Sequence, residues 1–200
     1  TIVNNNYIKD ISNIPQFFVL GAETFSTLPA NQMYRPMVST SLAIDYFIAG
    51  DLSPLVFHID NFIFFILILI IGFFVLEHIT RSLIKERNTR IILSSLVVLF
   101  WGMHTTNAET INYIIARSDI HSTFFLLLAF FIRIKFPKAG KFGIDLIPLF
   151  IGILFKSTAL MYFPIIFAYH LFCENDLIKE SYNLNSFLKA FILTFRKTFL

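Results

Sequence analysis

The sequence predicts an all-α fold, a polytopic bundle of transmembrane helices that follows a long loop outside the membrane. Hydrophobic residues make up 56% of the 200 residues and charged residues only 14%, whereas a soluble domain carries about 25% charged residues. The mean hydropathy is +0.71, and the apolar residues fall in long runs that basic loops separate. One small core cannot bury so much apolar surface, so lipid must solvate part of it.

Residues 1–54 differ in composition from the rest of the chain. They are rich in Asn, Pro and Ser and contain no uncharged stretch long enough to cross a bilayer. We expect them to form a loop on the non-cytoplasmic side with short amphipathic helices, one of them around residues 37–49. Residues 55–200 then form the transmembrane helical domain.

The apolar runs predict the membrane spans, since about 20 helical residues cross the hydrocarbon layer. The predicted spans are approximately 55–79, 90–106, 114–134, 143–156 and 157–173, with the start of another from 186. The first span is the clearest, because residues 61–76 carry no charge. The chain starts without a methionine and ends inside an apolar run, so we expect a fragment of a longer protein.

Two short loops hold eight of the sixteen Lys and Arg residues. These residues are Arg81, Lys85, Arg87, Arg90, Arg133, Lys135, Lys138 and Lys141. Cytoplasmic loops carry such an excess of positive charge, so loops 80–90 and 133–141 are predicted to be cytoplasmic. Residues 1–54, the segment 104–119 and Lys156 then lie together on the opposite side.

The most informative residues are the ionisable side chains His104, Glu109, Arg117 and Asp119, between two apolar runs, and Lys156. Such groups are costly near a bilayer unless they pair, line a wet cavity or act chemically. On one helix Glu109 and Arg117 would stand about 12 Å apart, too far to pair. Plainer interpretations stay open: solvated charges on an interfacial helix with a local Arg117–Asp119 contact, and a lysine that snorkels to the headgroups.

Other polar residues have simple structural interpretations. Pro36 pushes Arg35 away from α-helical geometry, which favours a tight turn before the helix expected at 37–49. His58 and Asn61 lie three residues apart near the start of the first span and favour interhelical packing. The aspartates of this region, Asp45, Asp51 and Asp60, are weak signals individually.

Several functional classes lack support in the sequence. It contains no zinc-type Cys/His spacing, no glycine-rich phosphate loop, no GxSxG and no HExxH, which argues against soluble nucleotide enzymes and metalloproteases. The basic residues are not gathered on one polar segment, so nucleic acid is not an expected partner. Cys173 is the only cysteine, so an intrachain disulfide cannot form.

Four strings together resemble a known family. They are Tyr34-Arg35-Pro36, Phe57-His58-Ile59-Asp60-Asn61, the spaced set His104, Glu109, Arg117 and Asp119, and Lys156-Ser157. Their order is similar to that in integral-membrane mannosyltransferases with C-terminal tetratricopeptide repeats, which belong to the GT-C class. The resemblance covers about residues 1–172. The chain departs from the family pattern at Phe65, Thr105, Ala116 and Ser157, where the family has His, Pro, Gly and Glu.

The resemblance implies a GT-C-like membrane domain that uses a polyprenyl-phosphate sugar and a protein acceptor with Ser or Thr hydroxyls. The implied substrate-binding residues are Arg35, His104, Glu109, Arg117, Asp119 and Lys156. Arg117 and Lys156 would hold the phosphate, with Arg35 as a third cation. Tyr34, Pro36, His58 and Asn61 would have structural roles. The catalytic acid would lie upstream of Thr1, and the repeats beyond Leu200.

The resemblance implies no obligatory cofactor, no protein-bound metal site, and leaves open a divalent cation. It also leaves open whether the membrane is a bacterial inner membrane or the endoplasmic reticulum. A competing hypothesis is a transporter or flippase, in which half-helices around Pro148 and Pro164 would frame a midplane site. Depth discriminates between the two, because a transferase site lies near one membrane surface. A third hypothesis is a non-catalytic scaffold.

Overall fold

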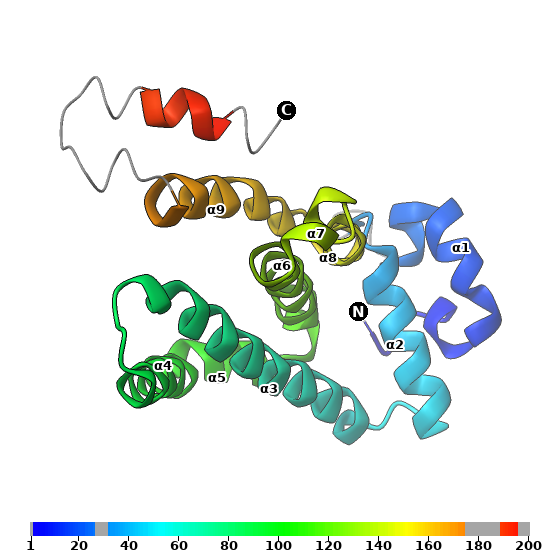
Figure 1. The fold of residues 1–200 in the computed structure, drawn as a ribbon. Helices are drawn as coiled ribbons and strands as arrows, with labels where there is room; N and C mark the ends of the chain where they lie inside the picture. The colour runs from blue at the N-terminus through cyan, green and yellow to red at the C-terminus, as the bar shows by residue number, and fades with distance from the viewer. Residues whose placement is uncertain (1, 27–31, 175–188, 196–200) are drawn as a thin grey trace.

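The computed structural model describes residues 2–26, 32–174 and 189–195 (Figure 1). In these residues the fold is entirely helical, as predicted. The α-helices are α1 (Ile14–Val19), α2 (Pro36–Ala49), α3 (Pro54–Ile79), α4 (Arg87–Gly102), α5 (Thr105–Asn112), α6 (Arg117–Lys135), α7 (Pro137–Lys141), α8 (Leu146–Phe155) and α9 (Tyr162–Tyr169). Short 3₁₀ segments are η1 (Tyr7–Lys9), η2 (Ile11–Asn13), η3 (Gly21–Thr24), η5 (Thr80–Ser82), η6 (Ile114–Ala116) and η7 (Ser157–Met161), and His170–Glu174 form a π-helical turn, η8.

The first 54 residues contain short helices, of which α2 is the longest. Arg35 has φ −138° and ψ 65°, outside the helical region, and Pro36 is in the first turn of α2, where its missing N–H costs no hydrogen bond. Gly50 ends the helix at φ 75°, a left-handed conformation that glycine adopts without steric strain. The helix predicted around 37–49 is therefore confirmed.

Two helices are long and apolar enough to cross a membrane, one over Pro54–Ser82 and the other over Ile114–Lys135. They coincide with the predicted spans 55–79 and 114–134. The 26 residues of α3 rise about 39 Å, which exceeds the roughly 30 Å of a hydrocarbon core. The fold therefore supports the prediction that the chain associates with a membrane through at least these two segments.

The span predicted at 90–106 is not one straight helix. Helix α4 ends at Gly102, and α5 continues at an angle of 60° to it. The break lies at His104, whose backbone is extended (φ −65°, ψ 135°) and whose Nδ1 accepts a hydrogen bond from the Thr106 N–H at 3.3 Å. This local side-chain cap starts a new helix where the apolar pattern predicted continuity.

The span predicted at 143–156 is shorter than expected, because α8 has 10 residues, which rise about 15 Å and do not cross a bilayer alone. The span predicted at 157–173 coincides with a helical segment that changes type along its length, from η7 through the 8 residues of α9 to η8. The extended backbone of Lys156 (φ −161°, ψ 137°) ends α8. Residues 189–195 are helical and belong to the segment predicted from 186, whose first three residues lie outside the described part.

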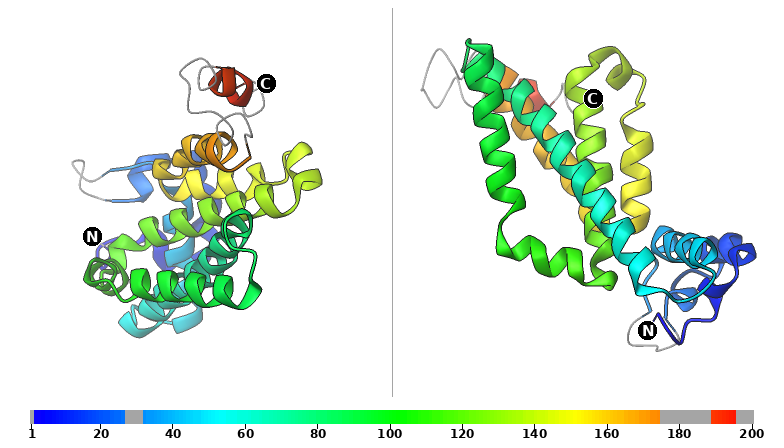
Figure 2. Two further views of the ribbon diagram at one scale, coloured as in Figure 1. Left: turned by 60° about the vertical axis from the view of Figure 1, so that its left-hand side comes forward. Right: turned by 90° about the horizontal axis from the view of Figure 1, so that it is seen from below.

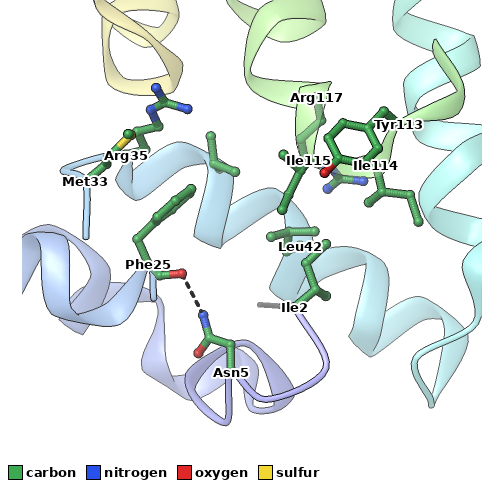
Figure 3. A pocket seen from close by; sticks show the side chains of 11 residues that line it. Ile2, Asn5, Phe25, Met33, Arg35, Leu42, Tyr113, Ile114, Ile115 and Arg117 are labelled. Carbon is green, nitrogen blue, oxygen red and sulfur yellow. Dashed lines mark hydrogen bonds between the residues drawn. The ribbon is translucent and has the colours of Figure 1, made fainter. Parts of the chain in front are cut away.

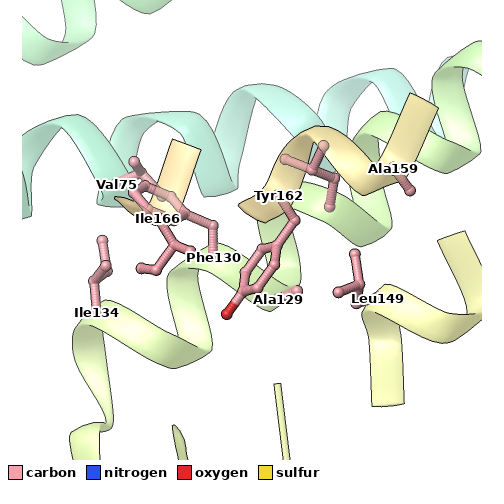
Figure 4. Close-up of a cluster of buried hydrophobic side chains, with 9 residues drawn as sticks. Val75, Ala129, Phe130, Ile134, Leu149, Ala159, Tyr162 and Ile166 are labelled. Carbon is pink, nitrogen blue, oxygen red and sulfur yellow. The ribbon is translucent and has the colours of Figure 1, made fainter. Parts of the chain in front are cut away.

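Helix α6 is the centre of the helical layer, packed against both α3 and α8. A buried apolar cluster joins α3, α6, α8, η7 and α9 (Figure 4). Its members are Val75, Leu126, Ala129, Phe130, Ile134, Leu149, Ala159, Tyr162 and Ile166. Gly152 permits the close approach of α8, because a Cβ there would lie 3.1 Å from the Cβ of Phe125 and 3.2 Å from that of Ala159.

A second apolar cluster fastens the first 54 residues to the long helices. It contains Ile8, Phe17, Val38, Leu42, Ala43, Phe57 and Phe155. In the right-hand view of Figure 2, α1, α2 and α5 lie at one end of α3 and α6, and α7 lies at the other. We call the first the polar end, formed by α2, α5 and the starts of α3 and α6. The second is the basic end, formed by residues 80–90 and 133–141.

Candidate functional site

Arg117, the first residue of α6, is fully buried at the polar end. One of its terminal nitrogens, Nη2, donates to Oδ2 of Asp45 in α2 at 2.5 Å and lies 3.4 Å from Oδ2 of Asp60 in α3. The other, Nη1, donates to the Ser41 hydroxyl at 3.0 Å. One guanidinium therefore joins three helices. With His121, these residues (Asp45, Asp60 and Arg117) form what we call the buried ion cluster.

His121 lies one turn after Arg117 on the same face of α6. Its Nδ1 is 2.9 Å from the carbonyl oxygen of Arg117, and its Nε2 is 3.1 Å from Oδ2 of Asp60. Among the described residues, neither His121 Nε2 nor Asp60 Oδ2 forms a hydrogen bond, so this second contact is one of proximity only. The ring centroids of Phe64 and Phe155 lie 3.9 and 4.7 Å from that of His121 and keep water from it.

Burying these charges is costly, and their mutual contacts offset only part of the cost. Nε of Arg117 has no hydrogen-bond partner among the described residues. Burial raises the pKa of the Asp45 carboxyl, and the Arg117 guanidinium acts in the opposite direction. Nearby Asn61 is also fully buried, and its Nδ2 donates to the carbonyl oxygen of Ile111 at 3.5 Å. These contacts hold α2, α3, α5 and α6 together at the polar end.

A second ion pair lies on α6 nearer to solvent. The Lys156 ammonium donates to Oδ1 of Asp119, and the two side chains are 26% and 45% exposed. The Ser122 hydroxyl donates to the carbonyl oxygen of Lys156 at 3.2 Å and so holds the extended backbone that presents the lysine. We call Asp119 and Lys156 the outer pair.

Arg35 lies beside a cavity of about 330 Å³ (Figure 3). Its Nη1 donates to the Ser118 hydroxyl at 3.3 Å, and its guanidinium carbon is 5.8 Å from the Phe25 ring centroid. It forms no ion pair within residues 2–26, 32–174 and 189–195. The remaining lining is mostly apolar and comprises Ile2, Asn5, Phe25, Met33, Val38, Leu42, Tyr113, Ile114, Ile115 and Arg117. An unpaired cation thus adjoins an apolar cavity.

No family model, curated protein or solved structure matches this chain. The resemblance to mannosyltransferases therefore stays a prediction that depends on the quoted strings. The described residues contain no group of three His, Cys, Asp or Glu side chains that could hold a metal ion.

The structure brings together four of the six predicted site residues, Arg35, Arg117, Asp119 and Lys156, around the start of α6. It does not bring His104 and Glu109, the predicted residues at the start of α5 and within it, into this group. His104 caps α5, and Glu109 is exposed on that helix without an ion pair among the described side chains. Glu109 therefore fits the plainer interpretation, a solvated charge.

The predicted structural residues have modest contacts. The Tyr34 hydroxyl donates to the carbonyl oxygen of Phe18 at 3.4 Å. Pro36 is buried at the start of α2, Asn61 joins α3 to α5, and His58 is half-buried. The plain alternative of an Arg117–Asp119 contact is not formed, because these two residues pair with Asp45 and Lys156.

Sequence reasoning missed the importance of Asp45, Asp60 and His121. A signal for each was present. Arg117 and His121 are four residues apart and share a helix face. Asp45 is the one Asp, Glu, Lys or Arg residue of α2, and Asp60 precedes the long uncharged run of α3. A carboxylate in such a position needs a buried cation.

Proposed function

We propose that this chain is part of the membrane domain of a GT-C class glycosyltransferase. In this proposal α3 and α6 cross the membrane, and the polar end lies at its non-cytoplasmic surface. The enzyme transfers mannose from a polyprenyl-phosphate donor to Ser or Thr hydroxyls of a protein. The observation that carries the proposal is the pair of accessible cations at one end of the two long apolar helices, Arg35, which lines an apolar cavity, and Lys156.

The donor explains why this combination is needed. Its isoprenoid tail stays in the bilayer, so its phosphosugar head reacts at the membrane surface. An apolar cavity that also carries a guanidinium fits the junction between tail and phosphate. As the glycosyl bond breaks, negative charge develops on the phosphate leaving group, and nearby cations stabilise it.

The contacts support a division of roles among the three cations. Arg35 has no carboxylate partner among the described residues, and Lys156 is partly exposed, so both are suited to the donor phosphate. Arg117 is fully buried and contacts two carboxylates. A phosphate would have to displace one of these carboxylates, so we give Arg117 the role of holding the site together instead of the phosphate role that the sequence suggested.

Depth favours the transferase over a transporter. Arg117 is the first residue of α6, and Asp60 is six residues into α3, a rise of about 9 Å. A transporter would hold such groups near the bilayer centre, about 15 Å from either surface of the hydrocarbon.

The test is transfer of labelled mannose from a polyprenyl-phosphate donor in membranes that contain the complete protein. We expect Arg35→Ala and Lys156→Ala each to reduce transfer at least about 100-fold, in line with loss of one stabilising donor to a charged leaving group. Lys9→Ala is the matched control, because Lys9 is a partly exposed cation within the same first 54 residues, and its ammonium donates to the side chain of Asn6. Wild-type transfer by both variants, at equal protein levels, would reject the proposal.

A further inference from the structure

A second cavity, of about 350 Å³, lies at the basic end, between the end of α6, α7, the start of α8 and α9. Arg133, Lys141 and Asp145 line its polar part, and Leu146, Phe163 and Ile166 line its apolar part. The proposed function makes no use of these residues. A ligand that fits both parts must be an amphiphile.

Asp145 is the unusual member of this cavity, because it is a carboxylate only 1% exposed. Its Oδ2 accepts a hydrogen bond from the Tyr162 hydroxyl. Its Oδ1 has no hydrogen-bond partner among the described residues, and the nearest cation atom, Nη1 of Arg133, is 3.8 Å away. A buried carboxylate oxygen without a donor is costly, so this atom calls for a donor from a ligand.

The cationic side of the cavity is fixed in place by the backbone. Nη1 of Arg133 donates to the carbonyl oxygen of Gly140 at 2.7 Å. A Cβ at position 140 would lie 2.7 Å from Cδ of Arg133, so glycine permits the arginine to lie across α7. Lys141, at the end of α7, is exposed and adds a second cation. Two cations and one buried acceptor therefore line one cavity.

We propose that this cavity binds an aminophospholipid headgroup, one that carries a phosphate and a primary ammonium. Arg133 and Lys141 hold the phosphate, and the ammonium donates to Oδ1 of Asp145. The acyl chains lie against the apolar wall that includes Leu146, which is 48% exposed. The site belongs to the loop 133–141, which the positive-inside pattern places at the cytoplasmic surface. The inference requires membrane insertion but not sugar transfer.

The experiment is native mass spectrometry of the purified complete protein with equal amounts of phosphatidylethanolamine and phosphatidylcholine. The two lipids carry the same acyl chains and are distinguished by the different masses of their headgroups. The choline headgroup keeps the phosphate but has no N–H donor. We expect at least about tenfold preferential retention of phosphatidylethanolamine, the effect of one charge-assisted hydrogen bond. Equal retention of the two lipids would overturn the proposal.

Variants separate the two halves of the site. Lys141→Ala should lower retention of both lipids, whereas Lys138→Ala, on α7 but outside the cavity lining, should not. Equal effects of these two exposed changes would overturn the phosphate assignment. Asp145→Asn should reduce the preference for phosphatidylethanolamine, provided that thermal unfolding shows a folded protein. If the wild-type protein transfers sugar but shows no preference between the two lipids, this inference is wrong and the proposed function is unaffected.

Discussion

The buried ion cluster and the outer pair both connect α6 to residues far away in the sequence, yet they differ in exposure. Arg117 is 0% exposed, whereas Lys156 is 26% exposed and its partner Asp119 is 45% exposed. A buried charge is bound to its partners, because separation leaves unpaired charges in a medium of low polarity. An exposed pair can exchange partners, since water stabilises the separated ions. The comparison teaches that the most conspicuous cation in the sequence, Arg117, is enclosed with its carboxylates, whereas Lys156 remains partly exposed.

The sharpest way to break this comparison is to remove the buried cation. We expect Arg117→Met to lower the free energy of unfolding by about 3–5 kcal/mol, because Asp45 would remain buried, and Asp60 partly buried, without a partner. Thermal unfolding in detergent would measure the loss. The loss should shrink as the pH falls, because burial raises the pKa of the Asp45 carboxyl and a protonated acid needs no cation.

A double variant provides the control. Arg117→Met combined with Asp45→Asn removes the charges of both partners, and we expect it to be more stable than Arg117→Met alone. If Arg117→Met costs less than about 1 kcal/mol, a typical value for an exposed ion pair, the distinction between the two groups of charges is wrong.

The outer pair should give the opposite result. We expect Lys156→Met to change the free energy of unfolding by less than about 1 kcal/mol, since both side chains are partly exposed. Sugar transfer should nevertheless be lost. Lys156→Arg, which keeps the charge, should recover part of the transfer. A large loss of stability in Lys156→Met would show that this lysine resembles Arg117 after all.

Glu86, fully exposed at the start of α4, provides the smallest effect. Its carboxylate accepts hydrogen bonds from the backbone N–H groups of Thr89 and of Asn88, the latter at 2.9 Å. These bonds with Thr89 and Asn88 lower the pKa of Glu86. At a pH above about 4.5, the pKa of Glu86 in the unfolded chain, the lowered pKa stabilises the fold. This contribution disappears as the pH falls through the pKa of Glu86 in the folded protein.

We therefore expect Glu86→Gln to lower the unfolding temperature slightly at pH 7 and to match the wild type under acid conditions. Unfolding curves at both pH values would check this. A difference between the two proteins that grows as the pH falls would contradict the capping role. As with Arg117→Met, this loss should be largest at neutral pH, but it should be much smaller.

Local patterns predicted the long elements well. The apolar runs located α3 and α6, and Pro36 marked the start of α2, because hydropathy and proline geometry act on neighbouring residues. The bend at His104 and the short α8 were not predicted. A side-chain cap and the extended backbone of Lys156 interrupt runs whose hydropathy alone favours a continuous helix.

The candidate site was predicted only in part for a related reason. The clustering of ionisable residues at one end follows from the alternation of apolar runs and basic loops. Their pairing does not, because Arg117 and Asp45 lie 72 residues apart and Lys156 and Asp119 lie 37 apart. No local pattern links residues at such separations.

By itself, the sequence determined that this protein is helical, that two of its helices can cross a membrane, and which loops carry positive charge. These properties depend on the apolar or charged character of each residue and on its near neighbours. Only the tertiary structure decided which cation is buried, which remains accessible, and that an unpaired carboxylate oxygen lines a cavity at the basic end. Burial and pairing depend on how distant helices pack, since the strength of a charge interaction is set by its surroundings.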